Sequence, residues 1–446
     1  MTFPFTGPWT SEHDGPLPDA ADVLVIGGGI IGVMTTYFLA LRGVRVVLCE
    51  KGRIAGEQSS RNWGWVRQQG RDPAELPIMI EALSLWRRLQ RAIGEDIGLR
   101  QEGVLYLANA AKDLEGFEAW LPHAREHGLD TRMLSRGEVA AMLRHAADWK
   151  GGLWTASDAR AEPWVAVPAL ARAAARAGAV IREHCAVRGI DVASGRVAGV
   201  VTEAGRIRAD RVVLAGGAWS SLLARVHGVD LPQLSVRATV AATVPLPQVF
   251  AGNAADGHFA FRRRLDGGYS IAPGGAHEFW TGPDALRHFG LYLPQLRRDR
   301  RSTRFRALAP KGYPDAWGTP RHWDADRESP FERCRVLDPP PNMRFLDDVR
   351  SRFGETFPSL GRPGIAAAWA GMIDVMPDTV PVVDHVATLP GLTIATGMSG
   401  HGFGIGPGFG RVVADLVEGR APGHDLSRFR LSRFTDGSKI DLGPSL

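Results

Sequence analysis

The chain has 446 residues, 44% of them hydrophobic and 23% charged, a composition typical of a soluble globular protein with core enough for two or three domains. Its three cysteines are odd in number and lie far apart, which argues against a disulfide scaffold and favours a reducing, cytoplasmic location. The formal net charge of +5 favours anionic substrates and leaves open a peripheral contact with the inner face of a membrane.

The first regular elements are expected after an irregular leader of about 20 residues. Residues 22–27, DVLVIG, predict a buried strand, residues 30–42 a helix, and residues 44–50, VRVVLCE, a second strand. The uncharged run at 23–41 could just span a bilayer by its length, but three consecutive glycines divide it and acidic residues precede it. We therefore expect no transmembrane or export segment.

The turn between the first strand and the first helix carries the pattern Gly27-x-Gly29-x-x-Gly32, and Glu50 ends the second strand. Gly27 permits the turn, Gly29 lets the backbone approach a pyrophosphate, and Gly32 lets the helix pack on the strand. The helix N-terminus offers partial positive charge to the phosphates, and the Glu50 carboxylate can accept both ribose hydroxyls. These residues predict a dinucleotide site, without separating FAD from NAD.

The next α/β elements are expected between residues 163 and 215. An alanine-rich helix starts at 163 and breaks at Gly178, and a strand that ends near Val187 follows it. Residues 195–217 predict a hairpin-like segment whose last part, 211–215, is a buried strand.

The periodicity then changes to alternating residues from about 236 to 282, which predicts an antiparallel sheet with a hairpin turn at 266–268. After residue 360 the pattern returns to short buried strands and a helix at about 408–418. We expect a Rossmann-like α/β domain interleaved with an antiparallel-sheet (α+β) substrate domain. The dinucleotide-binding domain would comprise 20–80, 152–232 and 355–425, the substrate domain 81–151 and 233–354, and the peripheral tails 1–19 and 426–446.

Residues 399–411, SGHGFGIGPGFGR, place a glycine at every second position, which suits either a flexible linker or a backbone cradle. Three other stretches help to decide: SSRNWGWVR at 59–67, ADRVVLAGGAWS at 209–220 and AWAGMIDVMPDTVPVVD at 368–384. Their order resembles the FAD-dependent D-amino-acid oxidase superfamily, in particular the branch with glycine oxidase, sarcosine oxidase and D-amino-acid dehydrogenase. The resemblance extends from about 21 to 418 and implies a cradle at 400–406 rather than a linker.

The resemblance implies FAD as cofactor. We expect it to be held non-covalently, because the histidine and cysteine used by covalent relatives have no counterpart within 51–80 and 361–384, respectively. The residues that it implies for cofactor binding are Gly27, Gly29, Ile31, Gly32, Glu50, Lys51, Ser59, Ser60, Arg61, Asn62, Trp63, Gly64, Val187, Ala215, Gly216, Trp219, Gly371, Gly400, His401, Gly402, Phe403, Gly404 and Ile405.

The implied activity is oxidation of the C–N bond of an amino acid or secondary amine by hydride transfer to flavin N5, giving an imine that hydrolyses, with oxygen or a quinone as electron acceptor. Arg67 and His401 are the expected catalytic residues, and Trp65 is an expected substrate contact. Strand alternation places His258 and Arg262 on one face of the antiparallel sheet. Both are substrate candidates if that face meets the flavin, and the alternative is that the face points to solvent.

One departure from the family weakens the prediction of a simple α-amino acid. Many amino-acid-specific members carry an arginine in a G-x-R-P sequence that binds the substrate carboxylate, whereas this chain has Gly371-Met372-Ile373-Asp374.

Other functions have less support. The basic segment at 297–306 is the basis for a flavoprotein that oxidises a modified tRNA base, and a flavin subunit of an opine-oxidase-like complex is the other alternative. Ser399 near His401 lacks the spacing of a nucleophile elbow. The zinc-like HAREH pattern at 123–127 has no third ligand, so we expect no metal.

Overall fold

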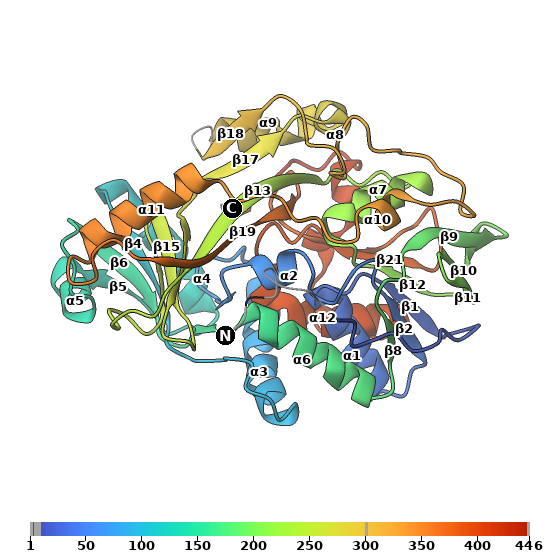
Figure 1. The fold of residues 1–446 in the computed structure, drawn as a ribbon, viewed down its shortest axis with the longest axis horizontal. Helices are drawn as coiled ribbons and strands as arrows, with labels where there is room; N and C mark the ends of the chain where they lie inside the picture. Colours follow the sequence, from blue (N-terminus) through green and yellow to red (C-terminus); the bar gives the residue numbers. More distant parts are fainter. Residues whose placement is uncertain (1–2, 4–9, 299–301, 444–446) are drawn as a thin grey trace.

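The computed structural model describes residue 3, residues 10–298 and residues 302–443. Within these residues the strands form a six-stranded sheet and a ten-stranded sheet, together with smaller sheets of three and two strands. The two large sheets lie towards opposite ends of the molecule, with the short helix α2 (Gln58–Arg61) between them (Figure 1). The chain crosses between the two ends several times, which confirms the predicted α/β fold with an interleaved, largely antiparallel part.

The six-stranded sheet is parallel except for one edge strand. Its order is β20-β21-β12-β1-β2-β8, and β20 runs antiparallel to its neighbour β21. The four inner strands, β21, β12, β1 and β2, are short and fully buried, which explains why they read as mainly apolar runs in the sequence. The strands of the sheet are β1 (Val23–Ile26), β2 (Val46–Cys49), β8 (Val180–Arg182), β12 (Val212–Leu214), β20 (Val382–His385) and β21 (Leu392–Thr396).

Alternate residues of β1 face two different layers. Val23 and Val25 belong to the core beneath a helical layer, whereas Leu24 and Ile26 belong to the core beneath a smaller sheet. The helical layer contains α1 (Ile30–Leu41), α3 (Leu76–Ala92), α6 (Pro163–Arg176) and α12 (Gly402–Glu418). The opposite layer contains β9 (Val187–Ala193), β10 (Arg196–Thr202), β11 (Gly205–Arg208) and α7 (Ser220–Val226).

The ten-stranded sheet is mainly antiparallel, with β13 paired to β16, β17 and β19. Gly267, with φ of 81°, forms the predicted hairpin turn between β15 and β16. Phe259 and Phe261 of β15 pack on Phe353 of α11 (Met343–Thr356), with ring centroids 6.0 and 5.6 Å away. The strands are β4 (Val104–Ala108), β5 (Thr131–Ser135), β6 (Gly151–Thr155), β13 (Leu234–Thr243), β14 (Asn253–Ala255), β15 (Phe259–Arg263), β16 (Tyr269–Pro273), β17 (His277–Trp280), β18 (Thr303–Arg306) and β19 (Ile365–Val375).

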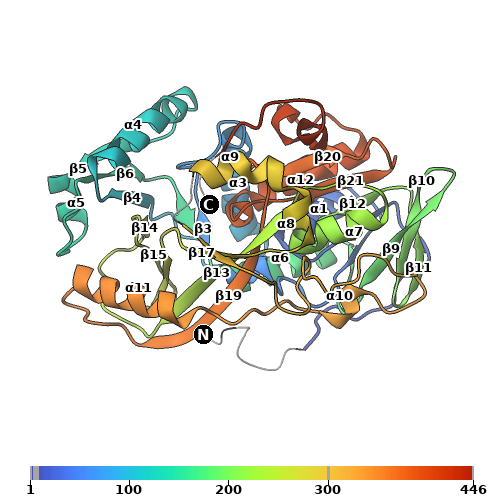
Figure 2. The same cartoon turned by 90° about the horizontal axis from the view of Figure 1, so that it is seen from above.

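Several shorter elements connect or cover the sheets. Helix α4 (Ala111–Glu126) stands at the edge of the ten-stranded sheet, where it projects away from the body of the molecule (Figure 2). The two-stranded sheet pairs β3 (Trp65–Val66) with β7 (Ala159–Arg160). The other helices are α5 (Arg136–Met142), α8 (Pro283–Arg287), α9 (Phe289–Arg298), α10 (Pro330–Arg333) and the short 3-10 helices Gly217–Trp219, Ser427–Phe429 and Leu431–Phe434.

Helix α12 corrects the interpretation of the glycine-rich stretch, because it begins at Gly402 rather than near residue 408. A Cβ atom added at Gly406 or Gly410 would lie 2.4 or 2.3 Å from side-chain atoms of α1. One added at Gly408 would lie 2.6 Å from a carbonyl oxygen of α3. Two residues in a helix span about 200°, so glycines at every second position alternate between opposite faces. The alternation therefore lets α12 pack closely between α1 and α3, and only its beginning can be a cradle.

The strands divide differently from the predicted domains. β6 lies mostly within 152–232 and β19 within 355–425, both assigned to the dinucleotide domain, yet both belong to the ten-stranded sheet. β19 does so because it pairs along β13. The strand expected to end near Val187 ends at Arg182, and Val187 begins the next strand.

Two aromatic side chains near the chain ends pack on the body of the molecule. Phe3 lies on Trp164 and Trp369, with ring centroids 5.5 and 5.9 Å away, and Phe429 is fully buried against Phe409. Residues 1, 2 and 4–9 of the predicted leader, and 444–446 of the predicted tail, lie outside the described residues.

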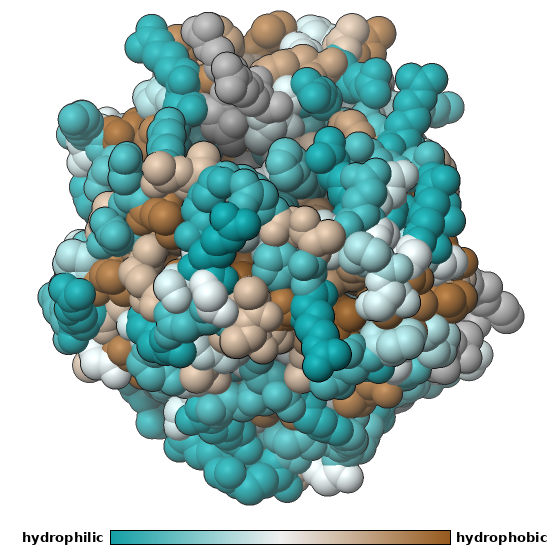
Figure 3. Space-filling view, turned by 90° about the vertical axis from the view of Figure 1, so that its left-hand side faces the viewer, coloured by the Kyte–Doolittle hydropathy of each residue, from teal (hydrophilic) through white to brown (hydrophobic). Residues whose placement is uncertain are grey.

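No helix in the described ranges has both the length and the apolar character needed to cross a bilayer. The face at the α5 and α11 end of the molecule shows mainly hydrophilic side chains, with smaller hydrophobic areas between them (Figure 3).

Candidate active site

The first glycine motif forms a tight turn between β1 and α1. Gly27 has φ of 108°, and an added Cβ would lie 2.5 Å from the carbonyl oxygen of Ala215 on the neighbouring strand end. A Cβ at Gly32 would lie 2.0 Å from the carbonyl oxygen of Gly27, so this position holds the helix against the turn. A cavity of about 110 Å³ opens beside this turn, lined by Gly27, Gly29, Glu50, Val187, Trp219 and their neighbours.

Glu50 lies at the wall of this smaller cavity, at the end of β2. Its two carboxylate oxygens accept hydrogen bonds from the backbone N–H groups of Gly28, at 2.7 Å, and Gly52, at 2.8 Å. These bonds fix the carboxylate, and each oxygen keeps acceptor capacity for a ribose hydroxyl. Burial raises the pKa of Glu50 above its ordinary value, while Lys51 and the two backbone bonds oppose that shift.

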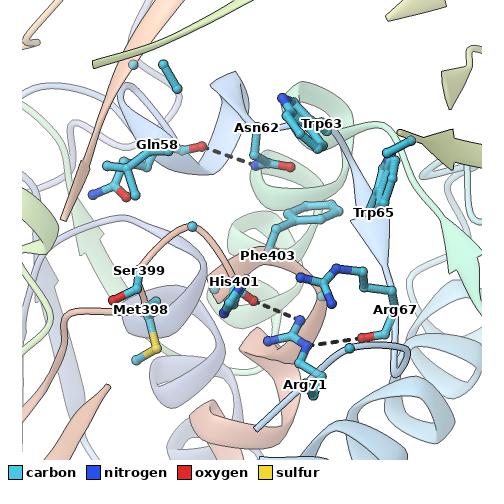
Figure 4. Close-up of a pocket in the computed structure, with 18 of the residues that line it drawn as sticks. Gln58, Asn62, Trp63, Trp65, Arg67, Arg71, Met398, Ser399, His401 and Phe403 are labelled. Atoms are coloured by element: carbon cyan, nitrogen blue, oxygen red, sulfur yellow. Dashed lines mark hydrogen bonds between the residues drawn. The ribbon is translucent and has the colours of Figure 1, made fainter. Parts of the chain in front are cut away.

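The segment after β2 forms a second, rigid wall. The Ser59 hydroxyl accepts a hydrogen bond of 2.9 Å from the Ile30 N–H and thereby caps the first turn of α1. The side chain of Asn62 accepts a bond of 2.8 Å from Gly64 N–H and donates to the Gln58 carbonyl at 3.1 Å (Figure 4). Because both side chains hold backbone, this segment has a fixed shape before any ligand binds.

A second cavity, of about 820 Å³, continues from the first. The two share the lining residues Gly29, Gln58, Ser59, Ala215 and Gly217, so they meet at the N-terminus of α1. The combined site is elongated, and a helix N-terminus lies at its middle, as a dinucleotide with a central pyrophosphate requires.

The N-terminus of α12 closes the large cavity on the far side. His401 is the residue before the helix, and Gly400, Gly402, Phe403 and Gly404 line the cavity with it. The partial positive charge of a helix N-terminus therefore points towards this part of the cavity. A Cβ at Gly404 would lie 3.0 Å from the carbonyl oxygen of Trp65, so the cradle packs directly on β3.

Two arginines line the cavity near the start of α12 (Figure 4). Arg67 was predicted from its sequence position, and its Nη1 donates to the Gln69 carbonyl. Arg71 was not predicted, because nothing in the sequence distinguishes it from the other arginines. Its Nη2 donates to the His401 carbonyl at 3.0 Å, and its Nε donates to the Arg67 carbonyl at 3.1 Å. Arg71 therefore ties the two walls of the cavity together.

Arg71 is buried, and its Nη1 lies 3.4 Å from a carboxylate oxygen of Glu75. Burial lowers the pKa of Arg71 to about 10, with Glu75 acting in the opposite direction. The guanidinium thus remains protonated at neutral pH and places a positive charge at the cavity wall.

Nineteen of the 23 residues predicted to contact the cofactor line one of the two cavities. Gly32, Ser60, Gly64 and Ile405 do not, and they pack behind the lining residues instead. The lining residues are Gly27, Gly29, Ile31, Glu50, Lys51, Ser59, Arg61, Asn62, Trp63, Val187, Ala215, Gly216, Trp219, Gly371, Gly400, His401, Gly402, Phe403 and Gly404.

The structure contradicts two predicted substrate contacts. His258 is exposed, precedes β15 and does not line the cavity. Arg262 does not line the cavity either: it is fully buried, and its Nη1 and Nη2 donate to both carboxylate oxygens of Glu162 at 3.0 and 2.9 Å. The strand alternation is correct, because Ala260 packs with Trp65. However, Arg262 lies in the interior, where a charge needs a partner.

Asp374 occupies the cavity wall near the position where many relatives carry an arginine. It accepts a hydrogen bond of 2.8 Å from Gly397 N–H, and burial raises the pKa of its carboxyl group. Two residues earlier on the same side of β19, Met372 belongs to the core under the small sheet. This strand therefore offers no cation to a substrate.

Two alternative sites find no support in the structure. The described residues contain no group of three or more histidine, cysteine or acidic side chains that could hold a metal ion. Of the basic segment 297–306, residues 299–301 lie outside the described residues, and the other members do not line the large cavity.

The geometry thus combines a dinucleotide cradle with a larger chamber that is lined by three arginines, of which Arg67 and Arg71 lie near the start of α12. A family model described as DAO, FAD dependent oxidoreductase, matches residues 22–416. The chain belongs to this family. FAD is accordingly its cofactor, and the two joined cavities, the Glu50 carboxylate and the N-termini of α1 and α12 fit that molecule.

Solved structures and curated proteins agree with the family. L-amino acid deaminase from Proteus myxofaciens, solved in complex with anthranilate, has a TM-score of 0.91 and 32% identity, covering 96% of this chain and 97% of the other. Glycine oxidase from Geobacillus kaustophilus is 27% identical over 92% of this chain and 97% of its own length. Human mitochondrial sarcosine dehydrogenase is 25% identical over 94% of this chain, which spans 42% of that longer protein.

Proposed function

We propose that this FAD-dependent oxidoreductase oxidises the C–N bond of an amino acid or a secondary amine. The observation that carries the proposal is the large cavity, in which Arg67 and Arg71 lie beside the N-terminus of α12. The names of the relatives, which include an L-amino acid deaminase, a glycine oxidase and a sarcosine dehydrogenase, support the same class of substrate.

Bound FAD would supply the acceptor for a hydride from the carbon beside the substrate nitrogen, and water would hydrolyse the imine that is left to a carbonyl compound and an amine or ammonia. The chain's part is to bind, orient and desolvate the substrate. Arg67 would hold the carboxylate of an amino acid through its planar set of N–H donors.

The substrate nitrogen must be neutral before its lone pair can stabilise the electron-poor carbon. The guanidinium groups of Arg67 and Arg71, which lie near each other in the cavity, disfavour a further positive charge beside them. They would therefore lower the pKa of a bound ammonium group and favour loss of its proton to solvent. The carboxylate of an amino acid would still be attracted by both.

The test is anaerobic reduction of the purified holoenzyme by a panel of amino acids, secondary amines and 2-hydroxy acids. Bleaching of the yellow flavin bands by members of the first two classes is the expected result. Bleaching by hydroxy acids alone, or by none of the panel, would overturn the proposal. Adding oxygen or a soluble quinone to the reduced enzyme then identifies the electron acceptor.

A further inference from the structure

One end of the large cavity is lined by aromatic rings. Trp63 and Trp65 pack edge to face with centroids 5.4 Å apart, and Trp65 lies 6.3 Å from Tyr106 of β4. Tyr106 in turn lies 6.1 Å from Phe117 of α4. These four rings are in contact one after another beside Arg67, and Trp120 lines the same cavity; we call the five rings the aromatic end of the cavity.

Helix α4 presents one face to this end. Asp113, Gly116, Phe117 and Trp120 all line the cavity, and their spacing of three, four and seven residues places them on one side of a helix. Trp120 anchors the helix, because its Nε1 donates to the carbonyl of Arg71 at 3.0 Å. The same residue that joins the cavity walls therefore also positions the aromatic end.

The carboxylates at this end already accept hydrogen bonds from backbone N–H groups. The Asp113 carboxylate accepts from the N–H groups of Asn109 and Ala110, at 2.8 and 3.0 Å. The Asp256 carboxylate accepts from the N–H groups of His258 and Phe259, at 2.8 and 2.9 Å. Neither carboxylate is arranged to select a basic substrate side chain. Lys112 of α4 also lines the cavity, but it is exposed to solvent, so the rest of the wall is mainly aromatic and favours an apolar side chain.

One positive group lies where a substrate carboxylate would bind. Arg67 lies with its guanidinium carbon 5.8 Å from the Tyr106 ring centroid, so its charge is at the edge of the aromatic end. An anionic group bound at Arg67 would therefore lie next to the rings, and a large apolar group of the same ligand would extend along them.

We infer that the aromatic end is a side-chain subsite, and that the preferred substrate is an amino acid with a large apolar or aromatic side chain whose carboxylate pairs with Arg67. The inference rests on the proposed function and adds to it the class of side chain. Burial of a phenyl group in such a site would raise kcat/KM for phenylalanine about 10- to 100-fold above that for alanine.

Gly116 provides a direct test. It lies in the middle of α4 and lines the cavity, and an added Cβ would meet no atom within 4 Å. Gly116→Phe should therefore fill the subsite while leaving α4 intact. Gly137 is a matched control, because it is an exposed helical glycine of α5 with equally open surroundings and no contact with the cavity.

The assay is reduction of bound FAD by both enantiomers of phenylalanine, leucine and alanine in the holoenzyme. The bound FAD of the parent and of Gly137→Phe should be reduced fastest by phenylalanine or leucine. Gly116→Phe should lose at least 10-fold in kcat/KM for these two and less than about 3-fold for alanine. Phe117→Ala is a second variant, which should weaken the preference for phenylalanine without blocking the site.

The outcomes separate the two levels of the proposal. If alanine is as good a substrate as phenylalanine for the parent, or if Gly116→Phe slows all substrates equally, the subsite is overturned and the C–N oxidation stands. If no amino acid or amine reduces the flavin in the parent, the proposed function fails and the subsite fails with it.

Discussion

Replacement of Arg67 should slow catalysis more than it weakens FAD binding. The half-buried guanidinium lines the large cavity, and its Nη1 is held by the Gln69 carbonyl. This bond fixes the side chain and leaves further N–H donors for a substrate carboxylate. Loss of one charge-assisted hydrogen bond costs about 1.5–3 kcal/mol, which corresponds to roughly 10- to 100-fold in rate. Arg67→Ala should show a loss of this size, and Arg67→Lys should recover part of it.

The assay is stopped-flow reduction of the holoenzyme by the best amino acid substrate, with FAD content measured on the same preparation. Arg132→Ala is the control, because Arg132 is an exposed arginine of β5 that pairs with Glu138 outside the cavity. Reduction of Arg67→Ala at the parental rate would place Arg67 outside the reaction. A variant that instead loses FAD would make Arg67 a cofactor residue.

Three further predictions concern stability, pH and the cofactor. Gly410→Ala places a Cβ 2.3 Å from Met34 and should destabilise the fold by about 1–3 kcal/mol, whereas Gly137→Ala, with nothing near, should stabilise it by up to about 1 kcal/mol in thermal unfolding. Burial raises the pKa of Asp158 from 3.8 to about 6, so the native state binds this proton more tightly, and its contribution to stability falls as pH rises between these values. The free energy of unfolding of Asp158→Asn, relative to that of the parent, should therefore rise by up to about 3 kcal/mol from pH 4 to pH 8. A difference between the two proteins that does not change with pH would refute this. Acid precipitation should release the FAD into the supernatant, and a yellow pellet would reveal a covalent bond.

Short-range patterns in the sequence predicted the local structure of the first glycine turn well. Gly27, Gly29 and Glu50 act through local turns and strand ends, and the structure places them where the motif requires. The alternating residues at 259–263 also predicted the correct faces of β15.

Features that depend on long-range packing were not predictable in the same way. The glycines of α12 suggested irregular backbone, because the helices that press on both its faces come from other parts of the chain. Nothing in the sequence around Arg262 indicates that Glu162, a hundred residues away, neutralises its charge. Arg71 gained its role only when folding brought it to the carbonyl of His401.

The central claim, that the enzyme breaks a substrate C–N bond, is tested most directly by product analysis after a single anaerobic turnover. For each FAD that is bleached by an amino acid, the account predicts one molecule of ammonia and one of the corresponding 2-oxo acid after hydrolysis. A secondary amine should give one amine and one carbonyl compound in the same ratio. Bleaching that leaves the substrate nitrogen attached to its carbon would contradict the account.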